Sequence, residues 1–434
     1  MAVEIPLWTP WLAPLRHRLT AALADLTGLP ADGAWHWQHD PKATGFQVSI
    51  RVEMAGSVAQ AQPDVTFGLG QPQLHRQATW QGQHLAVELR SSIPSALRSE
   101  LIRRLQAIDA QGAQGPLLGQ ALQAWQAWRP YAGMRDEDVR TFSNGEAMLR
   151  LGFACNQNCD FCFQDRQWPA APHEMLKLWL DEFLAQAPKR VVFSGGEPLV
   201  HGPLLLELAE RCQGHQVPLW LQTNAIGLDV AKRLQSLQNA GLVGALVSYH
   251  AASAPVSDAL TRAPGTHERT ERGILALLRA GLRVDLNGVV DARTLPDLLQ
   301  RSQRICAVFL PHCQYPGQLS VAFAFPTRDA GGGTYDAYAL PLDTIAPVLN
   351  AAAVVLVDAG IAVTADGSCG FPQCTLPRWL RNQAAITDHA DEHQQSREKT
   401  AICHDCVLKD QCMGPRRDYL QRFGTRGIVA QAEL

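Results

Sequence analysis

The sequence has no strong excess of charge and no long apolar run, and each absence excludes a class of protein. Its 434 residues carry a formal net charge of −3, so nothing indicates nucleic acid as an obligate partner. No stretch reaches the roughly 18 uninterrupted apolar residues of a membrane span. The first residues include an early Glu4 and several prolines, which make a poor signal peptide. We therefore expect a cytoplasmic protein with no membrane and no nucleic-acid partner.

Cysteines are numerous, but they do not form the pattern of a disulfide-rich secreted protein. The chain has 11 cysteines, an odd number, and most of them lie in two groups with ligand-like spacing. Thiolates in such groups bind metals, and a reducing compartment keeps them available for that role. The sequence therefore predicts metal-bound thiolates in a cytosolic protein.

The first cysteine group is the run CNQNCDFC, in which Cys155, Cys159 and Cys162 are spaced C-x3-C-x2-C. Three thiolates leave one iron of a [4Fe–4S] cluster without a protein ligand, whereas an electron-transfer cluster uses four cysteines. An open iron indicates chemistry at the cluster. A zinc knuckle pairs two C-x2-C units with distant partners and fits this spacing less well. Three unrelated buried cysteines are the remaining alternative.

This spacing, with the aromatic Phe161 just before the last cysteine, resembles the cluster loop of the radical S-adenosylmethionine (radical SAM) superfamily. The resemblance implies that SAM chelates the open iron and that Phe161 contacts the cofactor. It implies that reduction of the cluster cleaves SAM to a 5′-deoxyadenosyl radical, which removes a hydrogen atom from the substrate. The cofactor then carries the difficult step, and the protein supplies position and shielding. An electron donor such as flavodoxin or ferredoxin is implied as a partner.

Residues 145–360 read as alternating strands and helices. Strands apolar on both faces, with amphipathic segments between them, indicate a parallel sheet covered by helices. The six predicted strands are at 148–154, 190–195, 218–224, 244–250, 283–290 and 319–325. Six such units match the partial (βα)6 TIM barrel that the resemblance implies. Active sites in such barrels lie at the carboxyl ends of the strands.

Two further segments complete the predicted α/β fold. Residues 1–144 hold seven of the 11 tryptophans, strand-like runs and two expected helices, and we interpret them as an N-terminal α+β accessory domain. Substrate or peptide recruitment is the alternative role for this domain. Residues 361–434 are expected to form a small C-terminal iron–sulfur cluster domain. The expected elements of the first segment are strands at 45–54 and 84–90 and helices at 95–109 and 117–128.

Glycines and polar residues stand at the carboxyl ends of the predicted strands. The run SGGEP places Gly195, Gly196 and Glu197 at the end of the second strand, and Gly195 lies 33 residues after Cys162. It resembles the GGE motif of the family, which binds the methionine amino group of SAM. Glycines at that point let the backbone approach a ligand closely, and an ordinary Gly-Gly turn is the alternative.

By the same resemblance, polar residues near the ends of the next strands are expected to contact SAM. These are Asn224, Ser248, Arg262 and Asn287. Arg262 would pair with the SAM carboxylate, because guanidinium suits bidentate recognition of that group. A capping or turn role is the alternative for each. Tyr249 and His250 are expected to face the same mouth of the barrel.

The second cysteine group lies near the C-terminus and forms a C…C-x2-C-x5-C set. Its members are Cys374, Cys403, Cys406 and Cys412. Four cysteines can ligate one [4Fe–4S] cluster or a tetrahedral Zn²⁺, and spacing alone does not separate these. The pattern, with Gly414, Tyr419 and Gly424 after it, resembles the auxiliary-cluster modules of radical SAM enzymes, called SPASM or, in a shorter form, twitch.

The resemblance to the full module is incomplete. SPASM modules have seven cysteines, one of them four residues beyond this core, where this chain has Arg416. We therefore predict one auxiliary [4Fe–4S] cluster. Cys369 is a spare cysteine for which a structural role is expected, with an alternative ligand or an active-site thiol as the other interpretations.

These features together predict a radical SAM enzyme that modifies a ribosomally synthesised peptide or protein by crosslinking, epimerisation or oxidation. Two alternatives stay open. One is a radical SAM enzyme acting on a small molecule such as a sugar, nucleotide or amino acid, and the other is a non-catalytic iron–sulfur or zinc scaffold. A cobalamin-dependent methyltransferase is not favoured, because no cobalamin-binding signature is visible in the sequence.

Overall fold

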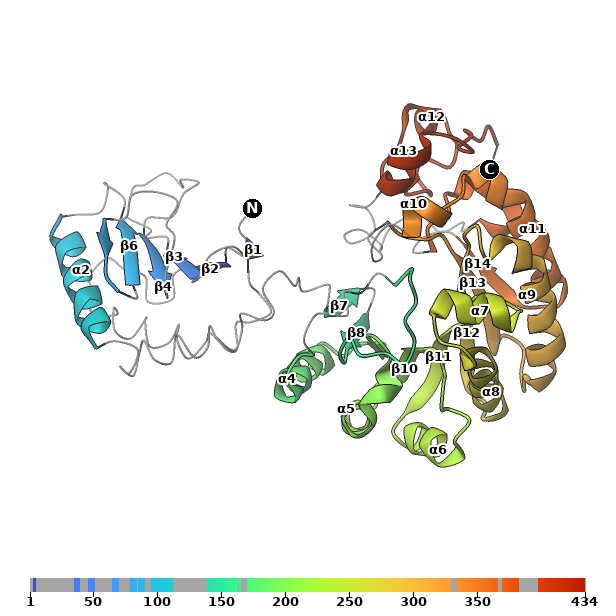
Figure 1. Ribbon diagram of the computed structural model, residues 1–434, viewed down its shortest axis with the longest axis horizontal. Helices are drawn as coiled ribbons and strands as arrows, with labels where there is room; N and C mark the ends of the chain where they lie inside the picture. The colour runs from blue at the N-terminus through green and yellow to red at the C-terminus, as the bar shows by residue number, and fades with distance from the viewer. Residues whose placement is uncertain are drawn as a thin grey trace. The chain divides into compact units, whose positions relative to one another are not determined.

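The chain divides into two compact units in the computed structural model, Met1–Asp138 and Val139–Leu434 (Figure 1). In the first unit the structure describes residues 3–4, 35–39, 46–50, 65–69, 79–83, 85–89 and 95–111. In the second unit it describes residues 139–143, 145–162, 164, 170–328, 334–365, 369–381 and 397–433. The units divide six residues before the predicted boundary at 144, because residues 140–143 pair with the sheet of the second unit.

In its described residues, the first unit contains an antiparallel sheet in the order β1-β2-β3-β4-β6-β5, followed by helix α2. Its elements are β1 (Val3–Glu4), β2 (Trp35–His39), β3 (Phe46–Ile50), β4 (Val65–Leu69), β5 (Trp80–Gln81), β6 (Leu85–Leu89) and α2 (Ser95–Ala110). Leu85 and Val87 of β6 are buried, as are Leu101 and Leu105 of α2. These elements match the predicted strands at 45–54 and 84–90 and the helix at 95–109, whereas the predicted helix at 117–128 lies outside the described residues.

The second unit is built on an eight-stranded sheet whose neighbours follow the order of the chain. Its strands are β7 (Arg140–Ser143), β8 (Glu146–Arg150), β9 (Arg190–Ser194), β10 (Leu219–Thr223), β11 (Leu242–Ser248), β12 (Arg283–Val289), β13 (Leu319–Ala324) and β14 (Ala362–Thr364). All pairs from β8 to β14 are parallel, and only β7 is antiparallel to its neighbour. β7 and β14 do not pair with each other, so the sheet is a partial barrel, as predicted.

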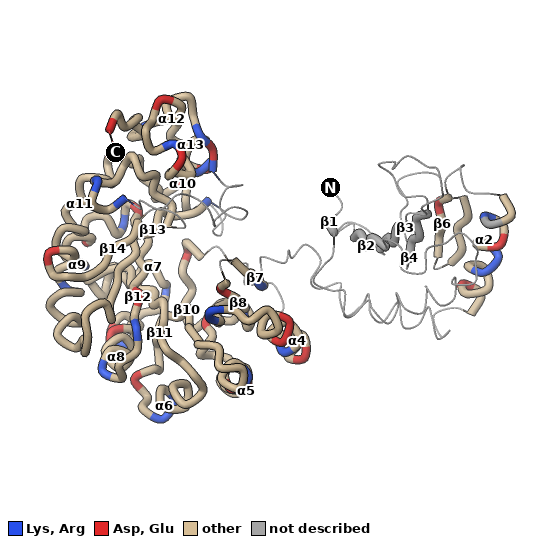
Figure 2. Tube along the Cα trace, turned by 180° about the vertical axis from the view of Figure 1, so that it is seen from behind, with Lys and Arg blue, Asp and Glu red and all other residues tan. Residues whose placement is uncertain are grey.

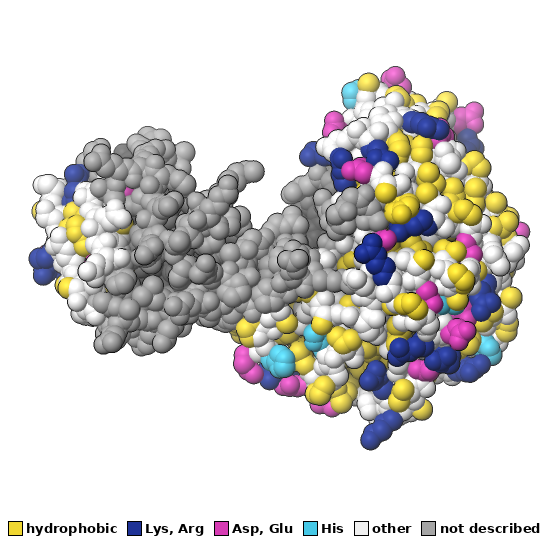
Figure 3. Space-filling model, in the orientation of Figure 1, with side chains coloured by type: hydrophobic (Ala, Val, Ile, Leu, Met, Phe, Trp, Pro, Cys, Tyr) yellow, Lys and Arg dark blue, Asp and Glu magenta, His cyan; other side chains and the backbone are white. Residues whose placement is uncertain are grey.

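Helices connect the parallel strands and lie around the outside of the curved sheet (Figure 1). They are α4 (His173–Leu184), α5 (Gly202–Gly214), α6 (Ala231–Asn239), α7 (Ala254–Thr261), α8 (Thr266–Arg279), α9 (Leu298–Arg304), α10 (Thr334–Tyr338) and α11 (Leu342–Asp358). In α8, Thr270, Ile274 and Leu277 are buried at spacings of four and three residues, the period of one helix face. Charged residues lie along the outer helices α4, α6 and α8 (Figure 2). Apolar and charged side chains are interspersed on one face of this unit (Figure 3).

The expectation that the strands are apolar on both faces is wrong for the inner face of the barrel. Along β12, Val284 and Leu286 are buried under helices, whereas Asp285 and Asn287 alternate with them and are half-buried. Ser320 alternates in the same way in β13. Because the barrel is open, its inner side chains reach a space that water can enter, and polar residues are stable there.

The C-terminal residues form short elements that pack on the end of the barrel. They are η9 (Gln373–Thr375), η10 (Arg378–Leu380), α12 (Ala401–His404) and α13 (Arg417–Phe423). Phe325, just after β13, contacts the rings of Phe371 and Tyr419 at centroid distances of 5.4 and 5.7 Å. These contacts explain why residues 361–434 belong to the same compact unit as the barrel. No helix among the described residues has the length and apolar character that crossing a membrane requires.

Candidate metal centre and cofactor site

The loop that carries the first three cysteines follows β8 and runs alongside the end of β9. The Leu151 amide donates to the Ser194 carbonyl at 3.0 Å, and the Gly196 amide donates to the Gly152 carbonyl at 2.8 Å. The Glu197 amide donates to the Ala154 carbonyl at 2.9 Å. Backbone pairing therefore continues past the two strands, and it places the cysteine loop directly beside the SGGEP run.

Gly195 and Gly196 are glycines because this loop approaches them so closely. Gly195 has φ of +129°, and a Cβ atom on it would lie 2.3 Å from the Gly152 carbonyl oxygen. A Cβ atom on Gly196 would lie 2.2 Å from the Ala154 carbonyl oxygen. The expectation was that these glycines make room for a ligand. In the structure, the absence of a Cβ atom at these two positions allows the backbone of the cysteine loop to lie directly against them.

Residues between the cysteines anchor the loop to the surrounding elements. Asn156 accepts a hydrogen bond from the Asn224 side chain, at the end of β10, at 2.6 Å. Gln157 is buried and donates to the Thr266 hydroxyl, at the start of α8, at 3.2 Å. The Asn158 amide donates to the carbonyl of Thr261, the last residue of α7, at 2.7 Å. Each of these spacer residues is therefore tied to a different element.

The last two spacer residues extend this pattern. The Asp160 carboxylate accepts hydrogen bonds from Arg293, in the loop after β12, at 2.7 and 2.9 Å. The Phe161 ring contacts the His250 ring edge-on, with centroids 4.7 Å apart. Phe161 thus fills the space against β11, and its expected contact with the cofactor stays a prediction.

The anchored spacers leave Cys155, Cys159 and Cys162 half-exposed and close together in the chain. The Gln157 amide donates to the Cys155 sulfur at 3.4 Å, and the Cys162 amide donates to the Cys159 carbonyl at 3.3 Å. Backbone N–H groups directed at sulfur stabilise thiolates. Three accessible thiols on a loop held by its other residues suit the three-thiolate ligation of a [4Fe–4S] cluster.

Glu197 connects the ends of two strands from a fully buried position. Its carboxylate accepts hydrogen bonds from the Thr223 hydroxyl at 2.6 Å, the Asn224 amide at 2.7 Å and the Leu199 amide at 3.0 Å. Burial raises the pKa of Glu197 to about 6, and these three donors oppose that rise. The side chain is already engaged with protein groups, so a contact with SAM would fall to the backbone of the SGGEP run.

Ser248 and Asn287 lie side by side, because they are paired neighbours at the ends of β11 and β12. Both side chains are half-buried on the inner face of the barrel, and neither hydrogen-bonds with another described residue. Two polar groups with unused hydrogen-bonding capacity at the carboxyl ends of strands are suited to bind a polar ligand.

Asn224 and Arg262 both lie beside the cysteine loop, and their expected contacts with SAM stay predictions. The Asn224 side chain bonds to Asn156 and caps its own turn by accepting from the Ile226 amide at 3.0 Å, so it orients the cysteine loop. Arg262 ends α7 in a left-handed conformation with φ of +47°, and its guanidinium lies 3.7 Å from Asp160. Its side chain is 59% exposed and remains available to an anionic ligand.

The expectation that Tyr249 and His250 face the mouth of the barrel is wrong for Tyr249, whereas His250 contacts the cysteine loop. Tyr249 is buried, and its hydroxyl donates to Glu271 of α8 at 2.8 Å. His250 is also buried, and it accepts from the Val289 amide at 3.3 Å through Nδ1. Burial, with Arg301 and Arg293 nearby, lowers the pKa of His250 to about 3 and keeps the ring neutral. The Tyr249 side chain therefore points into the layer between sheet and helices, whereas the His250 ring lies against Phe161 of the cysteine loop.

Two residues that hold the loop were not found from the sequence. Asn156 and Arg293 belong to no motif, and only their position in the fold shows what they contact. A polar residue between two ligand cysteines was the available signal for Asn156. No comparable signal exists for Arg293, which lies 133 positions from Asp160 in the chain.

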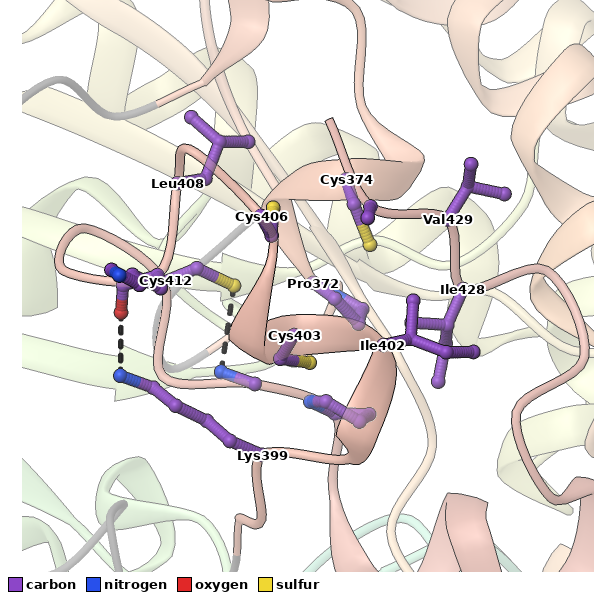
Figure 4. Close-up of a pocket in the computed structure, with 14 residues that line it drawn as sticks. Pro372, Cys374, Lys399, Ile402, Cys403, Cys406, Leu408, Cys412, Ile428 and Val429 are labelled. Carbon is purple, nitrogen blue, oxygen red and sulfur yellow. Dashed lines mark hydrogen bonds between the residues drawn. The ribbon is translucent and has the colours of Figure 1, made fainter. Parts of the chain in front are cut away.

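The second cysteine group lines an open pocket in the C-terminal segment (Figure 4). Cys374, Cys403, Cys406 and Cys412 all line it, with Lys399 and Lys409 on the wall. Amides donate to the sulfurs of Cys406 and Cys412 at 3.4 Å, from Gln431 and Gly414. Burial and the other three cysteines raise the pKa of Cys374 to about 11. A bound cation would lower that pKa, because metal-bound thiols are deprotonated.

Among the described residues, no group of three or more histidine, cysteine or carboxylate side chains is arranged to hold a single metal ion. The four cysteines surround a pocket without converging on one ion position. Four cysteine sulfurs suit either an iron–sulfur cluster or a zinc site in which the cysteines move closer together when the ion binds. Cys369 is half-buried, and its carbonyl accepts from the Phe325 amide at 2.7 Å.

Comparison with known proteins shows what the barrel is similar to. The family model described as Radical SAM superfamily matches residues 149–296. Two curated relatives match similar lengths of the chain. The AdoMet-dependent heme synthase of Oleidesulfovibrio alaskensis is 26% identical over 166 residues, 36% of this chain and 42% of the relative. The probable GTP 3′,8-cyclase of Aeropyrum pernix is 29% identical over 147 residues, 31% of this chain and 40% of the relative.

The matched part of the chain thus spans less than half the length of these curated relatives. Among solved structures, Streptococcus suis SuiB bound to the precursor peptide SuiA aligns with a TM-score of 0.42 and 12% identity. That alignment covers 67% of this chain and 66% of SuiB.

Proposed function

The chain is a member of the radical SAM superfamily of enzymes, and we propose that it modifies a peptide or protein substrate by radical chemistry at the mouth of its barrel. When bound, a [4Fe–4S] cluster and SAM supply a carbon radical that can remove a hydrogen atom from an unactivated position. The observation that carries the proposal is the cysteine loop, in which every spacer residue is anchored and the three cysteines are left accessible.

We assign the protein groups as follows. Cys155, Cys159 and Cys162 would hold the catalytic cluster. The backbone of Gly195, Gly196 and Glu197 would receive the methionine amino group, while the Glu197 carboxylate holds the ends of β9 and β10 together. Ser248 and Asn287 would bind the polar parts of SAM, and Arg262 would bind its carboxylate. A substrate bound in the open barrel would limit the access of water to the reacting atoms.

A peptide or protein substrate is supported by the parts of the chain outside the barrel. The first unit has its own sheet and helix and contributes no strand to the barrel, so it is available to recruit a macromolecular substrate. The four-cysteine pocket provides a second place for redox chemistry, since an auxiliary cluster can accept the electron released when a substrate radical forms a new bond.

A small-molecule substrate is the second candidate. The observation that favours it is that the curated relatives are named for heme and GTP. Both candidates share the same cofactor chemistry and differ only in what enters the barrel. An electron donor such as flavodoxin or ferredoxin is proposed for either.

The first experiment measures SAM cleavage. The reconstituted protein, with SAM and dithionite under anaerobic conditions, is expected to form 5′-deoxyadenosine. The Cys155→Ala/Cys159→Ala/Cys162→Ala variant is expected to form none. Cys313→Ser serves as the matched control, because Cys313 is also half-buried but lies before β13, away from the loop. A triple variant with wild-type activity would contradict the assignment.

The second experiment identifies the substrate class. Candidate peptides with deuterated side chains are incubated with the enzyme, and deuterium is measured in 5′-deoxyadenosine by mass spectrometry. Transfer from a peptide supports the proposal. Transfer only from a deuterated nucleotide, sugar or amino acid would replace it with the small-molecule candidate.

A further inference from the structure

Arg293 is presented to the cysteine loop by a rigid turn after β12. The Asp291 carboxylate accepts hydrogen bonds from the Arg293 amide at 2.9 Å and the Thr294 amide at 3.3 Å. The Asp291 amide donates to the Thr294 hydroxyl at 2.9 Å, and that hydroxyl donates to the Val289 carbonyl at 2.9 Å. Asp291 and Thr294 are almost fully buried. These hydrogen bonds fix the backbone of the turn, so the point from which the Arg293 side chain extends has little freedom to move.

The Arg293 guanidinium is held on three sides. Nη1 donates to both Asp160 oxygens at 2.7 and 2.9 Å, and Nε donates to Asp291 at 3.1 Å. Its Cζ atom lies 4.0 Å from the ring centroid of Tyr338, the last residue of α10. The side chains of Arg293 and Asp160 are only 21% and 12% exposed. An ion pair that is shielded and doubly hydrogen-bonded is stronger than an exposed one.

The position of Asp160 gives this ion pair its significance. Asp160 directly follows Cys159 and lies two residues before Cys162. Arg262 approaches the same carboxylate, but at 3.7 Å and from an exposed side chain. Arg293 is therefore the main counterion of a carboxylate located inside the cysteine loop.

We propose that Arg293 is a positioning residue for the catalytic cluster. It holds the loop in its ligating conformation and neutralises the Asp160 charge beside the cluster. This inference rests on the proposed role of Cys155, Cys159 and Cys162 as cluster ligands. Charge near an iron–sulfur cluster changes its reduction potential, and groups that orient metal ligands influence metal retention.

The direction in which each substitution shifts the reduction potential of the cluster follows from the charge that the substitution removes. Arg293→Gln removes a positive charge beside the cluster, which opposes addition of an electron and makes the potential more negative. Asp160→Asn leaves the guanidinium without that partner and makes the potential less negative. The double variant removes one charge of each sign and is expected to return close to the wild-type value. A residue with a merely structural role would not give opposite shifts that cancel.

The apoprotein is used to test whether Arg293 holds the cysteine loop in place. Hydrogen exchange of a peptide spanning residues 155–162 is expected to be faster in Arg293→Gln, because the Asn158 and Asp160 amides bond to α7 carbonyls only while the loop stays in place. Arg272→Gln is the matched control, since it removes an arginine that pairs with Asp229 at 2.9 Å on the exposed surface of α8. It is expected to leave exchange of the loop unchanged.

The potentials are measured by EPR-monitored redox titration of reconstituted wild type, both single variants, the double variant and Arg272→Gln. Iron retention during chelator challenge is expected to fall on the order of tenfold in Arg293→Gln. Shifts of the same sign in both single variants, or unchanged loop exchange in Arg293→Gln, would overturn the inference. If no variant and no wild-type protein assembles a cluster at the loop, the proposed function fails, whereas the exchange experiment still decides whether Arg293 holds the loop.

Discussion

Glu197 illustrates how one residue can match a motif and still serve a role that the motif does not reveal. The sequence places a carboxylate at the end of the second barrel strand, where it was expected to meet SAM. The structure buries that carboxylate and surrounds it with three donors from β10 and η4 (Pro198–His201). Its first role is therefore to hold two strand ends in register beside the cysteine loop.

The raised pKa of Glu197 leads to a prediction about stability and pH. The folded state binds the proton more tightly than the unfolded state, since its pKa is about 6 against an ordinary value of 4.5. The protonated form therefore stabilises the fold at low pH, and this contribution is lost as pH rises from about 4.5 through 6. A difference of this size corresponds to about 2 kcal/mol.

Urea unfolding of the apoprotein tests this prediction at pH 4.5 and pH 7.5. Glu197→Gln cannot ionise, so the stability of the wild type relative to the variant is expected to fall by about 2 kcal/mol between the two pH values. A relative stability that is the same at both values would show that Glu197 does not titrate in this range.

At the scale of elements, the loop after β8 and the run after β9 function as one unit. Their backbones continue to pair after the strands end, which requires two residues without a Cβ atom. The proximity of the cysteines and the SGGEP run is thus a consequence of strand pairing. Any ligand bound to the cysteines would lie next to that run.

Gly196→Ala is expected to destabilise this unit. The added Cβ would meet backbone oxygen atoms of Ala154 and Phe153 at 2.2 and 2.5 Å, and backbone cannot move aside as a flexible side chain can. We expect a loss of about 1 to 3 kcal/mol in unfolding free energy, together with weaker iron binding. Gly214→Ala is the control, because nothing lies within 4 Å of a Cβ there. Equal effects of the two substitutions, measured by urea unfolding, would contradict this explanation.

At the scale of the whole molecule, the chain has two cysteine sites of different character. The first is a loop at the mouth of the barrel with three accessible cysteines, and the second is a pocket lined by four. Three ligands leave a position open for a small molecule, whereas four ligands complete a site. Under the proposed function, this difference assigns a catalytic role to the first site and an electron-accepting or structural role to the second.

Cys406→Ala is expected to remove the metal of the second site alone. Iron analysis should show a loss of about four irons per chain if that site holds a [4Fe–4S] cluster. SAM cleavage without substrate should persist, because the barrel loop is unchanged. Unchanged iron with a loss of zinc would instead identify a zinc site.

The strands and helices of the fold could be predicted from the sequence more completely than the contacts between side chains. The strands β9, β10, β12 and β13 lie within the predicted ranges 190–195, 218–224, 283–290 and 319–325. Alternating apolar segments carry this information locally, because each strand and helix buries its own apolar side chains. The predicted orientation of Tyr249 was wrong, since strand identity does not tell which layer a residue enters when both neighbouring layers accept large side chains.

The sequence by itself determined the barrel architecture of this protein and indicated its cofactor chemistry. Three cysteines at C-x3-C-x2-C, a GGE run at the next strand end and six alternating βα units are local patterns, and their order along the chain is more specific than any one of them. The number of cysteine ligands and the order of the strands depend on residue type and spacing along the chain, and both can be read from a single sequence.

Only the tertiary structure decided which residues hold those cysteines in place. Asn224, Thr266 and Arg293 each bond to a residue of the loop over a sequence separation of 68 to 133 positions. No local pattern specifies such pairs, because they form only when strand ends and helix ends meet at one edge of the barrel. The spacer residues anchor the loop and leave the cysteines accessible, and this division of roles becomes visible only once the barrel is folded.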